Sequence, residues 1–311
     1  MGKTAFIFPG QASQYVGMAK DFYDSSPEVR KLYERASEIL GYDLADVSFN
    51  GPIEKLTQTA YTQPAILVHS LAVLRDMGDD YGEVEFAAGH SLGEYSALAF
   101  AGVLTFEDAV LAVRERSRAM QAACDAAEGT MAALIGCEGE NLDNLVQGAS
   151  KAGIIQPANF NSPGQVAVSG ERRAIEKAIE IAKDYGARKA IPLQVGGAFH
   201  SPLMEPAREK VAEVLNQMQF NDSRIAVVTN VEARGETDSD HLRELLIRQI
   251  TSPVLWKQSV EYMVENGVER FIEIGPGKVL SGLVKRTVRS ADIGNIDTVE
   301  DLKKFKEFVS A

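Results

Sequence analysis

The chain has 311 residues, of which 45% are hydrophobic, and a formal net charge of −12 at pH 7. This composition predicts a globular protein with a large core, and its acidic surface argues against nucleic-acid or anionic-membrane partners because like charges repel. The two cysteines, Cys124 and Cys137, fit a reducing compartment better than a disulfide framework. No apolar run has the length of a signal peptide or a membrane span, so we expect a cytoplasmic protein.

The first part of the chain alternates strands and helices. An apolar strand over residues 4–8 is followed by helices over residues 26–41 and 62–78. A second strand over residues 84–89 comes before a helix that begins after Thr105. Such alternation predicts a mostly parallel sheet with helices on both faces.

The pattern changes between residues 129 and 193, where the predicted order is strand, helix, strand, strand, helix, strand. This is the order of a ferredoxin-like unit. Strand patterns resume at residues 224–230 and 269–275. We therefore predict a large α/β domain, residues 1–128 and 194–311, with a ferredoxin-like domain inserted at residues 129–193.

Residues 89–93 read Gly-His-Ser-Leu-Gly, a G-x-S-x-G pattern between a short strand and a helix-forming run. This context is typical of a nucleophile elbow, in which Ser91 lies on a sharp turn and glycines avoid collisions with the neighbouring backbone. A helix that begins at Ser91 would also direct N–H groups toward a developing oxyanion. The same residues fit a serine N-cap, and the local pattern leaves the two interpretations about level.

A serine nucleophile needs a base, and the chain has four histidines. His69 lies in an apolar helix, His90 at the variable position of the elbow, and His241 in a polar segment. His200 lies in a glycine-rich loop at the predicted domain junction, where a substrate has room to approach. This position favours His200 as the base, although a single histidine is more often structural.

Arg116 lies on the apolar face of the helix after Thr105, with Ala112 and Met120. A cation on that face needs an anionic partner. Helix position alone favours an internal ion pair, or a head group that reaches water, over a ligand carboxylate.

Seven ordered blocks, spread over nearly the whole chain, resemble those of the malonyl-CoA:acyl carrier protein transacylases. They are FPGQASQ, GHSLGEYSAL, VRERSRAMQ, NFNSPGQVAVSG, GAFHSPLM, RQITSPVLW and EIGPGKVLSGLVKR. The resemblance implies a serine acyltransferase of fatty-acid synthesis, with an α/β-hydrolase-like large domain, a ferredoxin-like insertion and the active site between them. Because seven blocks are far more specific than one pentapeptide, the nucleophile interpretation of Ser91 now outweighs the N-cap.

The family's pattern implies a role for each matching residue. Ser91 would take the malonyl group from coenzyme A as an ester, with His200 as general base and then acid, before the phosphopantetheine thiol of the carrier protein receives it. The backbone N–H groups of Gln11 and Leu92 match the oxyanion hole. Arg116 would bind the malonyl carboxylate as a bidentate pair.

Three further site residues follow from the resemblance. A backbone carbonyl near Gln249 would orient the histidine in place of an acidic residue, which makes a Ser-His dyad. Phe199 occupies the position that goes with malonyl rather than methyl-branched groups in related polyketide acyltransferases. Excluding one methyl group is worth only about 1–3 kcal/mol, so we expect a preference rather than absolute rejection. Asn159, locally a turn residue, is a further substrate-binding candidate.

The implied acceptor is an acidic carrier protein, which this acidic chain would meet with local basic residues. The available clusters are Arg188 with Lys189, and Lys285 with Arg286 and Arg289. Such runs are also typical of solvated helix faces.

The resemblance implies no bound cofactor, and the sequence has neither a metal-ligand pattern nor a complete P-loop. The substrates would be malonyl-CoA and the phosphopantetheinylated carrier protein. Three alternatives stay open: an acyl hydrolase, a trans-acting acyltransferase of polyketide synthesis, and a non-catalytic module that binds carrier protein.

Overall fold

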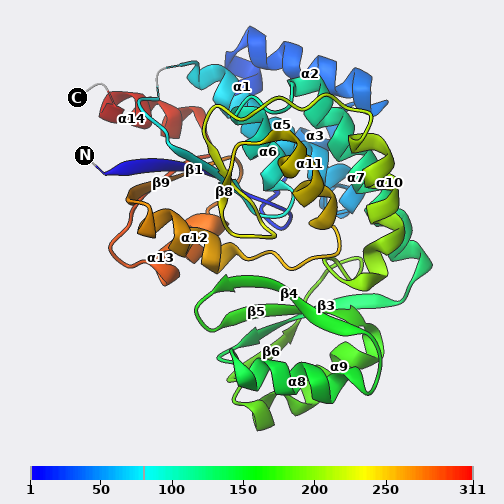
Figure 1. The fold of residues 1–311 in the computed structure, drawn as a ribbon. Helices are drawn as coiled ribbons and strands as arrows, with labels where there is room; N and C mark the ends of the chain where they lie inside the picture. The colour runs from blue at the N-terminus through cyan, green and yellow to red at the C-terminus, as the bar shows by residue number, and fades with distance from the viewer. Residues whose placement is uncertain (1, 80, 310–311) are drawn as a thin grey trace.

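The computed structural model describes residues 2–79 and 81–309, and its strands form two sheets (Figure 1). Sheet A has the strand order β10-β9-β1-β2-β7-β8, in which all neighbours are parallel except β7 and β8. Its strands are β1 (Lys3–Phe8), β2 (Phe86–Gly89), β7 (Ala226–Val228), β8 (Gly235–Glu236), β9 (Val268–Ile274) and β10 (Asp292–Ile296).

Helices cover both faces of sheet A because successive side chains of its central strand point to opposite faces. Phe6 and Phe8 belong to the core shared with α2, α5, α6 and α7, whereas Ala5 and Ile7 pack with α12 and α13. The mostly parallel, doubly covered sheet predicted from the sequence is therefore confirmed.

The helices that do not pack on the outer face of sheet B complete the large part of the molecule. They are α1 (Lys20–Ser25), α2 (Pro27–Leu40), α3 (Leu44–Asn50), α4 (Ile53–Leu56), α5 (Thr59–Met77), α6 (Gly93–Phe100), α7 (Phe106–Ala126), α10 (Glu205–Leu215), α11 (Ser239–Arg248), α12 (Trp256–Glu265), α13 (Val279–Thr287) and α14 (Val299–Val309). None of the helices among the described residues has the length and apolar character needed to cross a membrane.

Two of these helices begin at the caps expected from the sequence. The Ser26 hydroxyl accepts the Val29 N–H at the start of α2, and Thr105 Oγ1 accepts the Asp108 N–H at 3.1 Å at the start of α7. Such bonds satisfy backbone N–H groups that have no partner inside the first helical turn.

Sheet B is antiparallel and has the order β4-β5-β3-β6. Its strands are β3 (Gly129–Ile135), β4 (Ile155–Ser162), β5 (Gln165–Glu171) and β6 (Lys189–Pro192), and its helices are α8 (Glu140–Ser150) and α9 (Arg172–Ile181). The order βαββαβ confirms the ferredoxin-like fold. The domain boundaries before residue 129 and after residue 193 stay a prediction.

The two faces of sheet B have different neighbours. Ala132 and Leu134 of β3 pack with α8 and α9, which lie on the side away from the large part of the molecule (Figure 1). Met131 and Ala133, the alternating residues, face the opposite way and line a cavity. Sheet B thus forms one wall of a space between the two sheets.

Candidate active site

Ser91 lies at a sharp turn between β2 and α6. Its φ angle is +51°, a left-handed conformation that non-glycine residues rarely adopt and that often occurs at functional sites. A Cβ atom at Gly89 would collide with the Gly93 carbonyl group, and one at Gly93 would collide with the Phe8 carbonyl. The close approach of these backbones explains both glycines. The helix α6 begins at Gly93, two residues later than the start expected at Ser91.

Asn230, just beyond β7, holds this turn in place. Its Oδ1 accepts the Ser91 N–H at 2.7 Å, and its Nδ2 donates to the Gly89 carbonyl at 2.6 Å. The Ser91 N–H is thereby occupied. An oxyanion at this site would have to use other donors.

His200 contacts the serine hydroxyl directly. The distance from Ser91 Oγ to His200 Nε2 is 2.8 Å, and His200 Nδ1 lies 2.9 Å from the backbone oxygen of Gln249. Because a carbonyl oxygen can only accept, Nδ1 carries the proton and Nε2 is free to accept the serine proton. Burial, together with the nearby charge of Arg116, lowers the pKa of His200 to about 3, so the imidazole is neutral at pH 7.

Arg116 is fully buried behind the serine. Its Nη2 donates to Ser91 Oγ at 3.0 Å and to the side-chain Oε1 of Gln249 at 2.9 Å, and its Nη1 donates to Gln63 Oε1 at 2.6 Å. Among the described residues no carboxylate pairs with it, and its Nε has no hydrogen-bond partner. Neither the internal ion pair nor the solvated head group that the sequence left open is therefore formed.

A buried carboxylate fixes the direction of the Gln249 side chain. Glu94 Oε2 accepts the Gln249 amide nitrogen at 2.7 Å and the Asn230 N–H at 3.3 Å, and Gln249 Nε2 also donates to the Ser91 carbonyl at 2.9 Å. The Gln249 amide oxygen is thus left to face Arg116. Burial raises the pKa of Glu94 to about 7.

Ser91, His200 and Gln63 border a cavity of ≈ 250 Å³ between the two sheets, and Arg116 lies behind this lining. The large part of the molecule contributes Gln11, Ser91, Leu92, Phe199 and His200 to its lining. Sheet B contributes chiefly apolar side chains and amides: Met131, Ala133, Asn159, Asn161, Gln165 and Ala167. The backbone N–H groups of Gln11 and Leu92 have no acceptor among the described residues. They are available to an oxyanion formed beside Ser91.

The comparisons with known proteins agree with this arrangement. A family model described as an acyl transferase domain matches residues 5–307. The malonyl CoA-acyl carrier protein transacylase of Bacillus subtilis is 45% identical over 304 residues, 96% of each chain. That of Staphylococcus aureus is 42% identical over 311 residues, 99% of each chain.

Solved structures show the same relationship. The acyl-carrier-protein S-malonyltransferase of Bartonella henselae superposes with a TM-score of 0.95 at 37% identity, over 99% of this chain and 100% of that one. A malonyl-transacylase in complex with a type II polyketide synthase acyl-carrier protein has a TM-score of 0.94 at 40% identity, over 98% of this chain and 99% of that one. This chain belongs to the malonyl-CoA:acyl carrier protein transacylase family.

One residue expected from the family resemblance has a different local structure. Asn159 lies within β4 rather than in a turn, and it forms a backbone bridge with Val254. The strand continues through the Asn-Phe-Asn segment because β5 and residue 254 supply hydrogen-bond partners that local sequence does not reveal. Asn159 still lines the cavity, as does Phe199.

The polar residues that hold the site in this transacylase were mostly missed by the sequence analysis. They are Gln63, Glu94, Asn161 and Asn230. Asn161 Oδ1 lies 2.9 Å from Nε2 of His90, which joins sheet B to the elbow. For Glu94 a signal was present: a carboxylate in the first turn of an alanine-rich helix, next to the serine.

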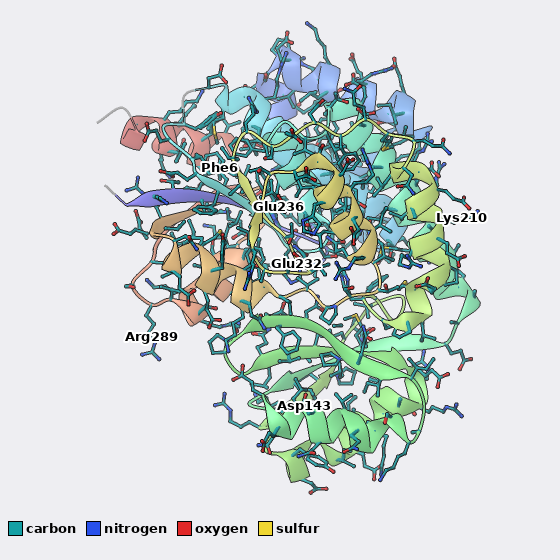
Figure 2. All side chains as sticks on the ribbon, in the orientation of Figure 1. Phe6, Asp143, Lys210, Glu232, Glu236 and Arg289 are labelled. Carbon is teal, nitrogen blue, oxygen red and sulfur yellow. The ribbon has the colours of Figure 1, made fainter. Side chains whose placement is uncertain are left out.

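The basic residues considered for the carrier protein are all exposed and lie in two neighbouring regions. Arg286 of α13 donates to Gln165 at 2.8 Å, at the cavity lining. Gln165 pairs with Ile135 in sheet B, and Ile135 pairs in turn with Lys189 of β6. Figure 2 shows Arg289 projecting outward beyond α13.

Proposed function

We propose that the chain transfers a malonyl group from malonyl-CoA to the phosphopantetheine thiol of an acyl carrier protein, through a malonyl ester on Ser91. The observation that carries this proposal is the position of Ser91 Oγ. It lies 2.8 Å from a neutral histidine nitrogen and 3.0 Å from a guanidinium that has no carboxylate partner among the described residues. The Ser91 hydroxyl thus contacts both a base and a cation that can bind an anionic acyl group.

In the first half-reaction His200 Nε2 takes the Ser91 proton as Oγ attacks the thioester carbonyl of malonyl-CoA. The carbonyl oxygen becomes an oxyanion, which the N–H groups of Gln11 and Leu92 stabilise. The C–S bond then breaks, and the imidazolium returns the proton to the leaving sulfur. The products are coenzyme A and malonyl-Ser91.

In the second half-reaction the carrier thiol gives its proton to His200 and attacks the ester. The tetrahedral intermediate collapses with cleavage of the C–Oγ bond, and His200 returns the proton to Ser91. The Gln249 carbonyl keeps Nδ1 protonated throughout. A neutral carbonyl stabilises imidazolium less than a carboxylate would, which suits exchange between activated thioesters. The proposed reaction proceeds with these side-chain and backbone groups and the two substrates.

Arg116 selects the acyl group in this proposal. Nη2 and the unpartnered Nε can pair with the two oxygens of the malonyl carboxylate, once Ser91 Oγ is esterified and no longer accepts from Nη2. Phe199 narrows the same cavity, so we expect malonyl to be preferred over methylmalonyl. Asn159, in the opposite wall, is proposed to contact the acyl or pantetheine group.

We place the carrier protein against Arg188, Lys189, Lys285, Arg286 and Arg289, which we call the basic rim. The contact between Arg286 and the cavity residue Gln165 supports this location, since the pantetheine arm must reach Ser91 from the carrier surface. The substitution Arg286→Glu should raise the KM for carrier protein about tenfold and leave acylation by malonyl-CoA unchanged. An unchanged carrier KM would remove Arg286 from the docking surface. The cytoplasm is the proposed location, because the free thiols of Cys124 and Cys137 fit a reducing compartment.

Mass spectrometry separates the proposed transferase from its alternatives. The protein is incubated with malonyl-CoA, and the mass of Ser91-containing peptides is measured before and after addition of holo carrier protein. We expect a malonyl adduct that moves to the carrier thiol. Absence of any adduct would favour a carrier-binding module, and release of free malonate despite the acceptor would favour a hydrolase. Parallel reactions with fatty-acid and polyketide carrier proteins identify the acceptor.

A further inference from the structure

The segment that carries Gln11 needs support from outside itself. We call residues 9–16, which follow β1, the Gln11 loop. Ala12 has a φ angle of +83°, and such a conformation in a non-glycine residue persists only where the surroundings hold it. Within the loop, Ser13 Oγ donates to the Gly10 carbonyl and Ala12 N donates to the Gln14 side chain. These bonds are local and do not fix the loop relative to Ser91.

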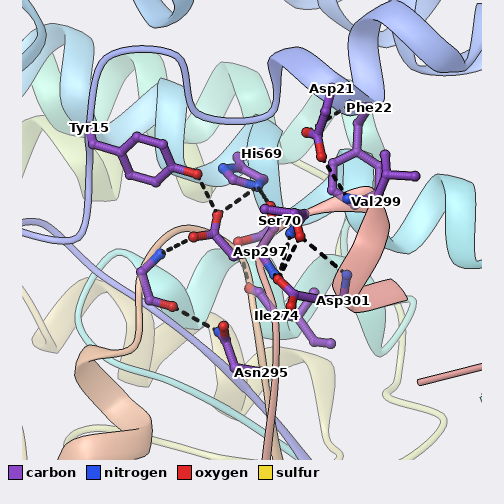
Figure 3. Close-up of polar contacts among 12 residues, drawn as sticks. Tyr15, Asp21, Phe22, His69, Ser70, Ile274, Asn295, Asp297, Val299 and Asp301 are labelled. Atoms are coloured by element: carbon purple, nitrogen blue, oxygen red, sulfur yellow. Dashed lines mark hydrogen bonds and ion pairs between the residues drawn. The ribbon is translucent and has the colours of Figure 1, made fainter. Parts of the chain in front are cut away.

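Asp297, directly after β10, supplies a long-range anchor (Figure 3). Its Oδ1 accepts the Tyr15 hydroxyl at 2.9 Å, across 282 positions of sequence. Its Oδ2 accepts the Gly277 N–H at 3.0 Å. One carboxylate therefore joins the Gln11 loop to the segment after β9, which leads into the cavity residues Val279 and Leu280.

The segment after β9 also touches the Gln11 loop directly. A Cβ atom at Gly277 would lie 3.4 Å from the Ser13 carbonyl oxygen, so the two backbones are in close proximity. Gly277 has a φ angle of +78°, which glycine adopts without strain. Asp297 thus restrains the Gln11 loop at Tyr15 and, through Gly277, at Ser13.

Asp297 is itself fixed by groups that take no part in the proposed chemistry. His69 of α5 donates from Nε2 to the Asp297 carbonyl at 3.0 Å, and Asp301 Oδ2 accepts the Asp297 N–H at 3.3 Å. His69 is fully buried, and the Asp297 side chain is only 14% exposed. Figure 3 shows Tyr15 and His69 converging on Asp297 from different elements. Residues of α5 and α14 therefore hold Asp297 on the side opposite the Gln11 loop.

We propose that Asp297 is a positioning residue that holds the Gln11 N–H in line with the oxyanion of the reaction. This inference rests on the proposed function, because it assigns Gln11 to the oxyanion hole. An oxyanion donor contributes only when it lies at hydrogen-bond distance from the developing charge. Loss of Asp297 therefore slows the formation of the tetrahedral intermediate and leaves the binding of malonyl-CoA intact.

The test uses the full-length variants Asp297→Ala, Tyr15→Phe and Asp292→Ala. Single-turnover release of coenzyme A is followed at several malonyl-CoA concentrations, which separates the acylation rate from the apparent dissociation constant. For Asp297→Ala we expect an acylation rate about tenfold lower, with a change in apparent dissociation constant below about twofold. Tyr15→Phe keeps the Gly277 contact and should lose about threefold.

Asp292→Ala is the matched control. Asp292 lies in the strand that precedes Asp297, β10, and forms an ion pair with Arg270 of β9 at 2.7 Å, away from the Gln11 loop. This variant should lower the melting temperature and keep the acylation rate within about twofold. A merely structural role for Asp297 predicts the same behaviour for both aspartate variants.

Wild-type acylation in folded Asp297→Ala would overturn the proposal, as would a loss confined to the dissociation constant. If Asp297→Ala does not fold, Tyr15→Phe decides: a reduced acylation rate supports the proposal, and a wild-type rate overturns it. The wild-type protein is measured first. Failure of the wild type to form malonyl-Ser91 contradicts the proposed function itself, and the Asp297 assignment with it.

Discussion

The two walls of the cavity differ in chemistry. The wall from the large part of the molecule carries Ser91, His200 and, behind them, Arg116. Side-chain amides hold Ser91 and Arg116, and the Gln249 backbone carbonyl holds His200. The wall from sheet B offers apolar side chains and the neutral amides of Asn159, Asn161 and Gln165. The reacting groups thus belong to the large part of the molecule, and sheet B supplies shape and neutral hydrogen bonds, among them one from Gln156 Nε2 to the His200 carbonyl at 2.6 Å. We therefore expect substitutions on the first wall to impair the reaction itself, and substitutions on the sheet B wall to act chiefly through KM.

The largest effect is expected for Ser91→Ala on the first wall. Removing the nucleophile should abolish the malonyl adduct and lower kcat by at least about 10⁴-fold, because no covalent intermediate can form. The adduct is measured by mass spectrometry. Ser96→Ala, in the buried part of α6 just after the elbow, is the control and should acylate normally. A surviving adduct in Ser91→Ala would place the nucleophile elsewhere.

The substitution Arg116→Ala should have the next largest effect. Charge-assisted hydrogen bonds to the malonyl carboxylate would be lost, so kcat/KM for malonyl-CoA should fall about 10²-fold, while acetyl-CoA is affected much less. The bias against acetyl-CoA should weaken accordingly. Arg118→Ala, on the exposed side of the same helix, should leave both values unchanged. An unchanged acyl preference in Arg116→Ala would rule out the role proposed for this guanidinium.

The pH dependence of acylation tests the environment of His200. An ordinary histidine, with a pKa near 6.5, would be largely protonated at pH 5.5 and would lose about tenfold in activity as a base. With the pKa lowered to about 3, His200 stays neutral, so acylation at pH 5.5 should remain close to its value at pH 7. Single-turnover release of coenzyme A between pH 5 and 8 measures this. An acid limb with its midpoint near 6.5 would contradict the account.

The same shift has a consequence for stability. Between pH 6.5 and 3 the unfolded chain binds a proton at His200 that the folded chain does not. The contribution of His200 to the free energy of unfolding is therefore full above pH 6.5 and is lost as the pH falls toward 3. Glu94 acts in the opposite direction: its pKa is raised to about 7, so its contribution is lost as the pH rises from 4.5 toward 7.

The smallest effect is expected on the wall from sheet B. Asn161→Ala removes the hydrogen bond to His90 and should lower kcat/KM about threefold, chiefly through KM, because no reacting group is touched. Steady-state kinetics with saturating carrier protein measure this. A fall in kcat as large as that of Arg116→Ala would show that sheet B takes part in the chemistry, and the contrast between the walls would fail.

Local sequence was enough to predict the helix that carries Arg116, whereas the elbow needed the family resemblance beside the local pattern. Gly89 and Gly93 meet a steric requirement that arises within five residues of sequence. The apolar neighbours of Arg116 lie on one face of a single helix, so their spacing alone indicates that face. The strand β10 could not be predicted in this way. Its short segment Asp292–Ile296 contains Gly294 and becomes a strand by pairing with β9.

Residues that hold the site from a distance were the least predictable. Asn230 contacts Ser91 across 139 positions, and Gln63 contacts Arg116 across 53. The sequence around a single polar residue does not identify its hydrogen-bond partner, because the two residues come together only in the folded chain. Asn159 shows the opposite error, since local turn chemistry was overridden by strand pairing.

The central claim is that one hydroxyl, one imidazole and one guanidinium act on the same acyl group. A crystal structure of the protein after reaction with malonyl-CoA, without carrier protein, tests it most directly. The account predicts an ester on Ser91 Oγ, with the malonyl carboxylate within hydrogen-bond distance of the Arg116 guanidinium and the ester carbonyl at the N–H groups of Gln11 and Leu92. A malonyl group on another residue, or on Ser91 with its carboxylate directed away from Arg116, would contradict the account.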